Sequence, residues 1–279
     1  MTTDAGVTIG GLMKVLPVVK AYPVIDKELR SEGVCVAGIS MEEPHKWVRL
    51  FPLDYRGLER AQQFKKYEVI EVTAKKNRKD PRPESYTPDL SSITTGERIG
   101  PEKNWRDRLP FFDAVEAESM CAIQRRQKED GTSLGVFRPA EIDDLVVTVA
   151  PAGFTESQSA LLNQPSFFGG QLGDSTRRAL EPLPIKAKFH YKCSDPGCKG
   201  HKQSLIDWEL GALYRTLAAK GDHQDTIFKK IRDKFYVQYC SEDNDTRFIT
   251  GSMLSKPGSF LVLGLVHPKR VVAPQEGLF

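Results

Sequence analysis

The chain has 279 residues, of which 39% are hydrophobic and 28% are charged, and its formal net charge is +3. This composition is too apolar for a disordered protein and allows one large globular domain or two of ordinary size. A charge of +3 does not by itself indicate nucleic-acid binding, because only the distribution of basic residues can make that case. No run of about 20 apolar residues occurs, so we expect no membrane-spanning helix and no membrane partner.

The first residues, MTTDAGVTIGG, lack a basic segment followed by an apolar core, so the sequence predicts no secretory signal and a cytoplasmic location. Thiols stay reduced in the cytoplasm, and the five cysteines are therefore expected to be free thiols or metal ligands rather than disulfides. Cys35 lies in the apolar run VCVAGI and is expected to be a core thiol.

The N-terminal part of the chain is predicted to be rich in strands. Apolar, β-branched and aromatic residues predict strands over residues 14–23, 33–40, 46–53 and 67–76. A short helix or turn is expected over residues 54–66, and the proline-containing residues 77–108 are expected to form a long loop. Four strands with short connections predict an antiparallel sheet or a partly open barrel.

The rest of the chain is predicted to mix helices and strands. Apolar periodicity predicts helices over residues 110–131, 204–219 and 222–240. Strands are expected over residues 132–139, 142–151, 183–193, 246–253 and 258–268. Residues 152–182 are expected to form a loop with a short helix at 155–163. The predicted fold class is therefore α+β, with a β-rich domain at residues 1–109 and a mixed α/β domain at 110–279.

Four of the cysteines are candidate metal ligands. Cys193 and Cys198 flank the tight turn SDPG, and this C-x4-C spacing brings two thiolates close together. The full candidate set is Cys121, Cys193, Cys198 and Cys240, with His201 as an alternative ligand. Cysteines dispersed over several elements favour an iron–sulfur cluster of the 4Fe-4S type over zinc, although both accept four thiolates. The alternative is that the flanking pair are turn residues and the others are core thiols.

Recurring basic residues predict a contact with nucleic acid. The alternation of residues 183–193 places Lys186, Lys188, His190 and Lys192 on one face of a strand. Like charges aligned in this way cost stability unless an anion is bound, and the phosphates of DNA or RNA are the expected anion. The predicted contact residues are Lys75, Lys76, Arg78, Lys79, Arg82, Lys186, Lys188, Lys192, Lys199 and Lys202. A solvated basic face is the alternative interpretation.

The sequence therefore predicts a nucleic-acid-binding protein with a structural, cysteine-ligated metal centre. One alternative is a metal-dependent nuclease or nucleotide-processing enzyme, and another is a subunit whose basic residues meet other protein subunits. No catalytic residues can be assigned. Asp207 and Glu209 are expected to point roughly 200° apart on a helix, which argues against a paired-carboxylate site there.

Several segments together resemble a family of uncharacterised bacterial proteins. These segments include KWVRLFPLDYRGL, KCSDPGCKGHKQSLIDWE and SFLVLGLVHPKR, and the similarity covers nearly the whole chain. The resemblance implies that the chain is a single functional unit. It implies no particular activity and no catalytic residue.

Overall fold

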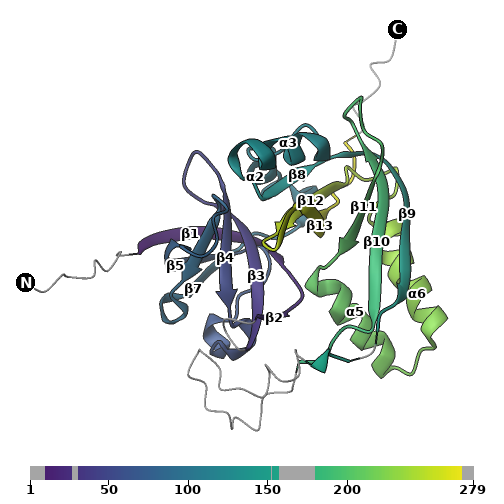
Figure 1. Cartoon of the computed structure of the whole chain (residues 1–279), viewed down its shortest axis with the longest axis horizontal. Coiled ribbons are helices and arrows are strands. Elements are labelled where there is room, and N and C mark those ends of the chain that lie inside the picture. The colour runs from purple at the N-terminus through teal and green to yellow at the C-terminus, as the bar shows by residue number, and fades with distance from the viewer. Residues whose placement is uncertain (1–9, 27–30, 152, 157–179, 272–279) are drawn as a thin grey trace, which may run out of the picture.

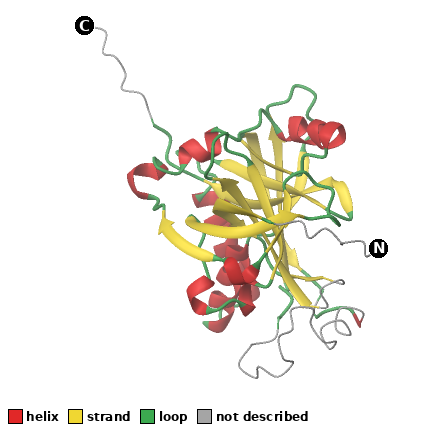
Figure 2. Cartoon of the chain, turned by 90° about the vertical axis from the view of Figure 1, so that its left-hand side faces the viewer, coloured by secondary structure: helices red, strands yellow, loops and turns green. Residues whose placement is uncertain are grey.

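The computed structural model describes residues 10–26, 31–151, 153–156 and 180–271. It contains two β-sheets, one from each half of the chain, with helices around them, which confirms the α+β class (Figure 1). Figure 2 shows that strands form the centre of the molecule and helices lie towards its periphery. Within the described part of the chain, every helix is too short or too polar to span a lipid bilayer.

The N-terminal sheet forms a barrel of five strands. In order around the ring they are β1 (Gly11–Lys20), β3 (Ser31–Ser40), β4 (Trp47–Leu53), β6 (Ser85–Pro88) and β5 (Glu68–Lys76). Pairing of β1 with β5 closes the ring, and all its pairs are antiparallel except β4 with β6. Two shorter strands, β2 (Val24–Asp26) and β7 (Thr94–Arg98), pair with β3 and β5. Buried aliphatic side chains fill the interior, among them Val15, Val36, Leu50, Ile70 and Val72.

Residues 77–108, expected to be a long loop, contribute two of these strands, β6 and β7. They also contain a 3-10 turn, η3 (Leu90–Ser92), and a short helical segment, α1 (Glu102–Trp105). The prolines and short polar runs of this segment did not predict these strands. Strand β6 is defined by its tertiary pairing with β4 rather than by an apolar pattern of its own. The expected short helix or turn over residues 54–66 consists of two 3-10 turns, η1 (Tyr55–Gly57) and η2 (Arg60–Gln62).

The C-terminal sheet has six strands. In order they are β8 (Leu134–Phe137), β12 (Arg247–Met253), β13 (Lys256–Val266), β11 (His201–Leu205), β10 (Ile185–Cys193) and β9 (Pro139–Val149). The helices α5 (Trp208–Ala219) and α6 (Gln224–Arg232) share a core with one face of the sheet. A π-helical segment, η4 (Asp233–Gln238), continues α6 directly. Strand β10 alternates buried and more exposed residues, as expected, with Phe189 and Tyr191 in the core.

Two predicted helices differ from the observed elements. The expected helix over residues 110–131 is two helices, α2 (Leu109–Asp113) and α3 (Met120–Asp130), because Ser119 caps the second by accepting an N–H from Ala122 at 3.0 Å. The helix expected over 204–219 begins only at Trp208, after strand β11. The short helix expected over 155–163 lies mostly outside the described residues.

The barrel and the C-terminal sheet pack directly against each other. One apolar cluster draws Leu16, Val18 and Ile39 from the barrel, and Leu134, Val136, Ile249 and Leu263 from the second sheet. A buried polar contact accompanies it, since Arg49 of β4 donates from Nη2 to the carbonyl of Ser133 at 3.1 Å and to its Oγ at 3.0 Å. Residues far apart in the sequence are therefore in contact at this junction.

Candidate metal centre and basic face

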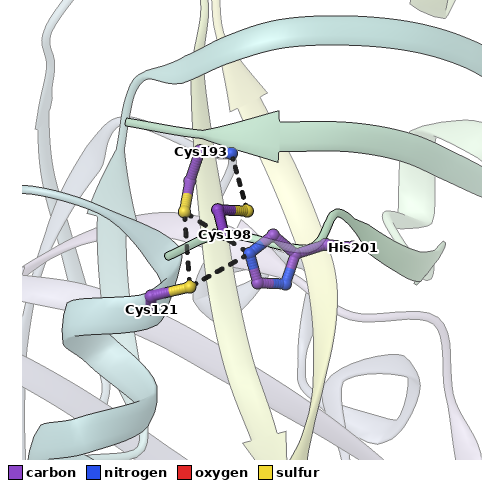
Figure 3. A group of neighbouring side chains, drawn as sticks. All are labelled: Cys121, Cys193, Cys198 and His201. Atoms are coloured by element: carbon purple, nitrogen blue, oxygen red, sulfur yellow. Dashed lines mark hydrogen bonds between the residues drawn. The ribbon is translucent and has the colours of Figure 1, made fainter. Parts of the chain in front are cut away.

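Three thiols and one imidazole meet at the end of β10 (Figure 3). One ligand atom from each of Cys121, Cys193, Cys198 and His201 lies within 4.8 Å of all the others. The Sγ of Cys193 is 3.6 Å from the Sγ of Cys121 and 3.4 Å from the Nε2 of His201. Four soft or borderline donor atoms at such separations could hold one metal ion.

Local structure brings these four residues together. Cys193 ends β10 and His201 begins β11, so the β10–β11 hairpin carries both, while Cys121 lies in the first turn of α3. The hairpin turn is tight, because Cys198 donates its backbone N–H to the carbonyl of Asp195 at 2.9 Å. Gly200 adopts a φ of 89°, a left-handed conformation that glycine enters without a steric penalty.

Two backbone groups point at the sulfur of Cys198. Its Sγ accepts N–H groups from Cys193 and Gly200, both at 3.4 Å, which fixes the position of the sulfur in the turn. The turn is also tied to α3, because Asp195 forms an ion pair with Arg125 at 2.7 Å. The hairpin and the helix therefore meet through polar contacts as well as through the four candidate ligands.

Two of the thiols influence each other's ionisation. Burial opposes ionisation of Cys193, but hydrogen bonds from backbone groups of Asp195 and Cys121 outweigh it and lower the pKa of Cys193 to about 6. Burial raises the pKa of Cys121 to about 12, with further contributions from its hydrogen bond to Cys193 and from the charge of that thiolate. A second thiolate beside the first is unfavourable without a cation, and a metal ion at the centre would provide one.

Cys240, the expected fourth thiolate, is not a member of this group. Its Sγ donates to the carbonyl of Phe235 at 3.3 Å, so the thiol faces its own helix, and burial raises its pKa to about 12. His201, the alternative ligand, stands with the three other cysteines instead. The sequence contained a signal for this arrangement, since Cys198 and His201 have the C-x2-H spacing of a short metal-binding turn.

The expected basic face exists on β10 and β11. Lys186, Lys188 and Lys202 are exposed, and within the described residues none of them forms an ion pair. Cross-strand neighbours are uncharged at Lys186, which faces Thr148, and at Lys188, which lies between Val146 and Ser204. His190 lies between Lys202 of β11 and Asp144 of β9, so four basic or imidazole groups share the face and a carboxylate lies at its β9 edge. We refer to Lys186, Lys188, His190 and Lys202 as the basic face.

The other C-terminal basic residues lie at the margin of this face. Lys192 forms an ion pair with Glu141 at 2.9 Å, and both side chains are more than half exposed. Lys199 is exposed in the turn between the ligands Cys198 and His201. The metal centre therefore adjoins the end of the basic face.

The N-terminal basic residues lie on the barrel. Lys75, Lys76, Arg78 and Lys79 are exposed around the end of β5. Lys76 stacks over the ring of Tyr86, with its Nζ 4.2 Å from the ring centroid. Arg82 differs, because its side chain is only 10% exposed and its donors are used within the protein. Arg82 is therefore a structural residue that joins the barrel to β12.

Replacing Arg82 with alanine should lower stability rather than nucleic-acid affinity. Its Nε and Nη2 donate to Asp80 at 2.8 and 2.6 Å, and its Nη1 donates to the carbonyl of Ser252 at 2.7 Å. Hydrogen bonds to charged groups contribute about 1.5–3 kcal/mol, so we expect a loss of about 2–3 kcal/mol in the free energy of unfolding at pH 7. The exposed Lys75→Ala variant should change it by less than about 0.5 kcal/mol.

The stability deficit of Arg82→Ala should depend on pH. Burial alone would raise the pKa of Asp80, but hydrogen bonds from Arg82 and Ser85 hold it below 3.8. A carboxyl group with a depressed pKa contributes stability above its unfolded pKa and loses it as the pH falls through the folded pKa. Urea unfolding should therefore show a smaller deficit at pH 3 than at pH 7, and an equal deficit at both would contradict this role.

A second cluster of charges was not expected from the sequence. The Nζ of Lys66 forms ion pairs with Oδ2 of Asp207 at 3.2 Å and with Oε1 of Glu209 at 3.1 Å. Asp207 is the N-cap of α5 and not a helical residue, so the expected separation of the two carboxylates around a helix does not apply. A capping aspartate just before an apolar helix was the only sequence signal for this geometry.

Two family models together match most of the chain. One is described as Domain of unknown function (DUF8757) and matches residues 115–279. The other is described as Domain of unknown function (DUF8758) and matches residues 12–114. The first includes all four residues of the candidate metal centre as well as the basic face. No match was found among curated proteins.

Proposed function

The chain belongs to the family described as Domain of unknown function (DUF8757), and from its geometry we propose that it is a nucleic-acid-binding protein with a structural zinc site. The observation that carries the proposal is the exposed basic face, whose lysines Lys186, Lys188 and Lys202 form no ion pair within the described residues and which ends at the candidate metal centre. DNA or RNA is the proposed partner. We also propose a cytoplasmic location, because all five cysteines are free thiols and thiols stay reduced in that compartment.

The separation of the ligand atoms supports a single zinc ion. Zinc binds sulfur at about 2.3 Å and imidazole nitrogen at about 2.0–2.1 Å, so tetrahedral ligand atoms lie roughly 3.5–3.8 Å apart. The closest pairs here are 3.4 to 3.6 Å apart. An iron–sulfur cluster attaches its thiolates to separate irons and needs a wider arrangement. Three cysteines and one histidine also form a complete structural zinc set.

The proposed role of the zinc is to hold α3 against the β10–β11 hairpin. Four protein ligands leave no open position for a substrate or an activated water, so the site is structural rather than catalytic. Cys121 comes from the helix, and Cys193, Cys198 and His201 come from the hairpin. Because the hairpin also carries Lys188 and Lys202, the ion would fix the strands on which phosphates are bound.

The basic face fits a phosphate backbone. Lys186 and Lys188 lie two residues apart on one strand, and Lys202 lies on its neighbour. Aligned lysines without counter-ions repel one another, and an anion that bridges them removes this repulsion. Binding of this kind releases counterions from the nucleic acid and therefore weakens strongly as salt is added.

Oligonucleotide binding should weaken when the charge of the face is reversed. We expect the double variant Lys186→Glu/Lys188→Glu to bind a fluorescein-labelled 20-nucleotide strand at least ten-fold more weakly than the wild type. The slope of log K against log salt should fall by about 1.4, since single strands contribute about 0.7 per phosphate contact. Fluorescence anisotropy with DNA and with RNA at several salt concentrations provides both quantities.

A charge-matched control distinguishes an effect of the basic face from an effect of the total charge of the protein. Lys220→Glu/Lys229→Glu changes two exposed lysines at the end of α5 and on α6, so it alters the total charge equally. This control should bind like the wild type. Equal weakening in both double variants, or no wild-type binding at low salt, would remove the proposal. Metal-dependent cleavage of the strand would instead indicate a nuclease.

A further inference from the structure

A row of aromatic side chains lies where the barrel meets the C-terminal half. Ring centroids are 5.6 Å apart for Tyr67 and Trp105, 5.1 Å for Trp105 and His267, and 3.8 Å for His267 and Tyr239. Tyr67 precedes β5, His267 follows β13, and Tyr239 follows η4, so the row is assembled from distant segments. Trp105, His267 and Tyr239 are half-buried and remain in contact with solvent.

One end of this row holds an arginine without a counter-ion. Arg108 is only 3% exposed, and its Cζ lies 3.7 Å from the ring centroid of Tyr67 and 4.9 Å from that of Trp105. Its Nε donates to the carbonyl of Ile99 at 2.8 Å. Among the described residues, no hydrogen bond and no ion pair reaches its two terminal nitrogens. A buried guanidinium with most of its donors unused is costly, because buried charges are normally paired.

The other end of the row holds a second cation. Lys234 of η4 has its Nζ 5.9 Å from the ring centroid of Tyr239, and it forms no ion pair within the described part of the chain. Lys66 is already neutralised by Asp207 and Glu209, whereas Arg108 and Lys234 form no ion pair within the described residues. Burial lowers the pKa of Arg108, and the charge of Arg98 adds to this effect, while Tyr67, Glu102 and Glu209 oppose it.

The backbone around the row is held in uncommon conformations. Tyr67, Lys103, Asn104 and Trp105 have φ values of 65°, 51°, 58° and 64°, which non-glycine residues rarely adopt. The π-helical segment η4 supplies Lys234 and ends beside Tyr239. Such conformations cost free energy and are concentrated at functional sites, where they aim side chains at a ligand.

We infer that this junction binds a nucleotide, with the base stacked on the aromatic row, its phosphate held by Arg108, and the positive charge of Lys234 at the other end of the row adding to the attraction. The planar guanidinium offers paired donors that match phosphate oxygens, and a lysine supplies a second charge. Aromatic faces accept any nucleobase by stacking. Glu209, with its side chain 45% exposed, provides a nearby acceptor for hydroxyl or amino groups of the ligand. The site shares no residue with the basic face, so it goes beyond the proposed binding of a nucleic-acid backbone.

The phosphate has two sources, a free nucleotide or the end of a strand. Five probes distinguish these sources: adenosine 5′-monophosphate, adenosine, inorganic phosphate, a 5′-phosphorylated tetranucleotide and the same tetranucleotide with a 5′-hydroxyl. We expect calorimetric titration to show binding of the monophosphate, or of the 5′-phosphorylated strand, at least ten-fold tighter than binding of the matching compound without the phosphate. Failure of both phosphorylated compounds to bind at millimolar concentration would overturn the inference.

Variants at the two cations test the geometry. Arg108→Gln should weaken binding of the phosphorylated ligand at least ten-fold, whereas Arg106→Gln should not, because Arg106 is exposed and paired with Asp107. Lys234→Gln changes a partly exposed residue, so it tests the site without risk to folding, and it should weaken binding at least three-fold. Unchanged affinity in both Arg108→Gln and Lys234→Gln would overturn the inference.

The test of nucleotide binding at the junction can be distinguished from the test of strand binding at the basic face. Lys186→Glu/Lys188→Glu should leave the affinity for the phosphorylated ligand unchanged, because neither lysine lies at the junction. Loss of strand binding in that variant with intact nucleotide binding supports two separate sites. Equal loss of nucleotide binding in that variant would place the phosphate on the basic face and overturn the inference.

Discussion

Replacement of Cys193 by serine should remove one zinc ion per chain and lower the stability of the protein sharply. Cys193 is 5% exposed, and its Sγ lies within 3.6 Å of candidate ligand atoms from both α3 and the hairpin. Structural zinc contributes on the order of 10 kcal/mol in small zinc-finger peptides. Here large apolar cores remain after the ion is lost, so we expect a smaller decrease of about 3–5 kcal/mol in the free energy of unfolding.

Elemental analysis and calorimetry measure the two parts of this result. Wild-type protein should contain one zinc and no acid-labile sulfide, and Cys193→Ser should contain neither. The destabilisation corresponds to a fall of roughly 10 °C in the melting temperature for a chain of this size. A chelator should move the wild type towards the variant and leave the variant unchanged, because only the wild type has an ion to lose.

Cys240→Ser is the matched control for this substitution. Cys240 has the same chemistry, but its Sγ contacts the carbonyl of Phe235 rather than the other candidate ligands. We expect this variant to retain a full equivalent of zinc. Iron and sulfide in the wild type, together with loss of metal from Cys240→Ser, would instead support the four-cysteine cluster that the sequence first favoured.

Sequence patterns were informative where the periodicity of a single strand or helix shows which of its residues are buried. Strand β10 is an example, because its period of two separates Phe189 and Tyr191 in the core from Lys186 and Lys188 on the outside. No tertiary partner is needed to see this alternation. The α+β class was predicted from such local patterns, because they identify strands and helices without knowledge of their tertiary partners.

Features that depend on pairing between distant segments were not visible. Strands β6 and β7 lack an apolar pattern, and their places in the barrel are set by β4 and β5. The fourth candidate ligand was misassigned in a similar way, because sequence spacing alone does not show that the thiol of Cys240 turns towards its own helix. His201 was the better candidate on local grounds, since it lies on the same hairpin as Cys193 and Cys198.

The ion pairs of Lys66 also could not be predicted from local sequence patterns, and they matter more for stability. Lys66 precedes β5 in the barrel, and Asp207 begins α5 some 141 positions later. Neither residue carries a local pattern that identifies the other as its partner. Burial makes the pairing important, because Asp207 is 2% exposed and its charge depends on Lys66 for compensation.

Lys66→Met should therefore destabilise the protein by about 3–5 kcal/mol, since removal of one partner leaves a buried charge uncompensated. Methionine nearly preserves the length of the side chain, so the loss of charge dominates over the loss of packing. The neighbouring Lys65→Met is the control, because Lys65 is exposed and should change stability by less than about 0.5 kcal/mol. Urea unfolding at pH 7 measures both, and equal stability of the two variants would contradict the role of Lys66.

The deficit of Lys66→Met should also decrease with acidification. Burial raises the pKa of Asp207, and Lys66 opposes this rise in the wild type. Without Lys66 the folded pKa of Asp207 rises further above its unfolded value, so the penalty is larger at pH 7 than in acid and is relieved as the pH falls towards about 4 and the carboxyl becomes neutral. Lys66 itself has a raised pKa, because attraction to Asp207 and Glu209 outweighs its burial, so it remains charged throughout this range. In Lys66→Met/Asp207→Asn the acid dependence should disappear, because the group that titrates is absent, and its persistence would assign the effect to another residue.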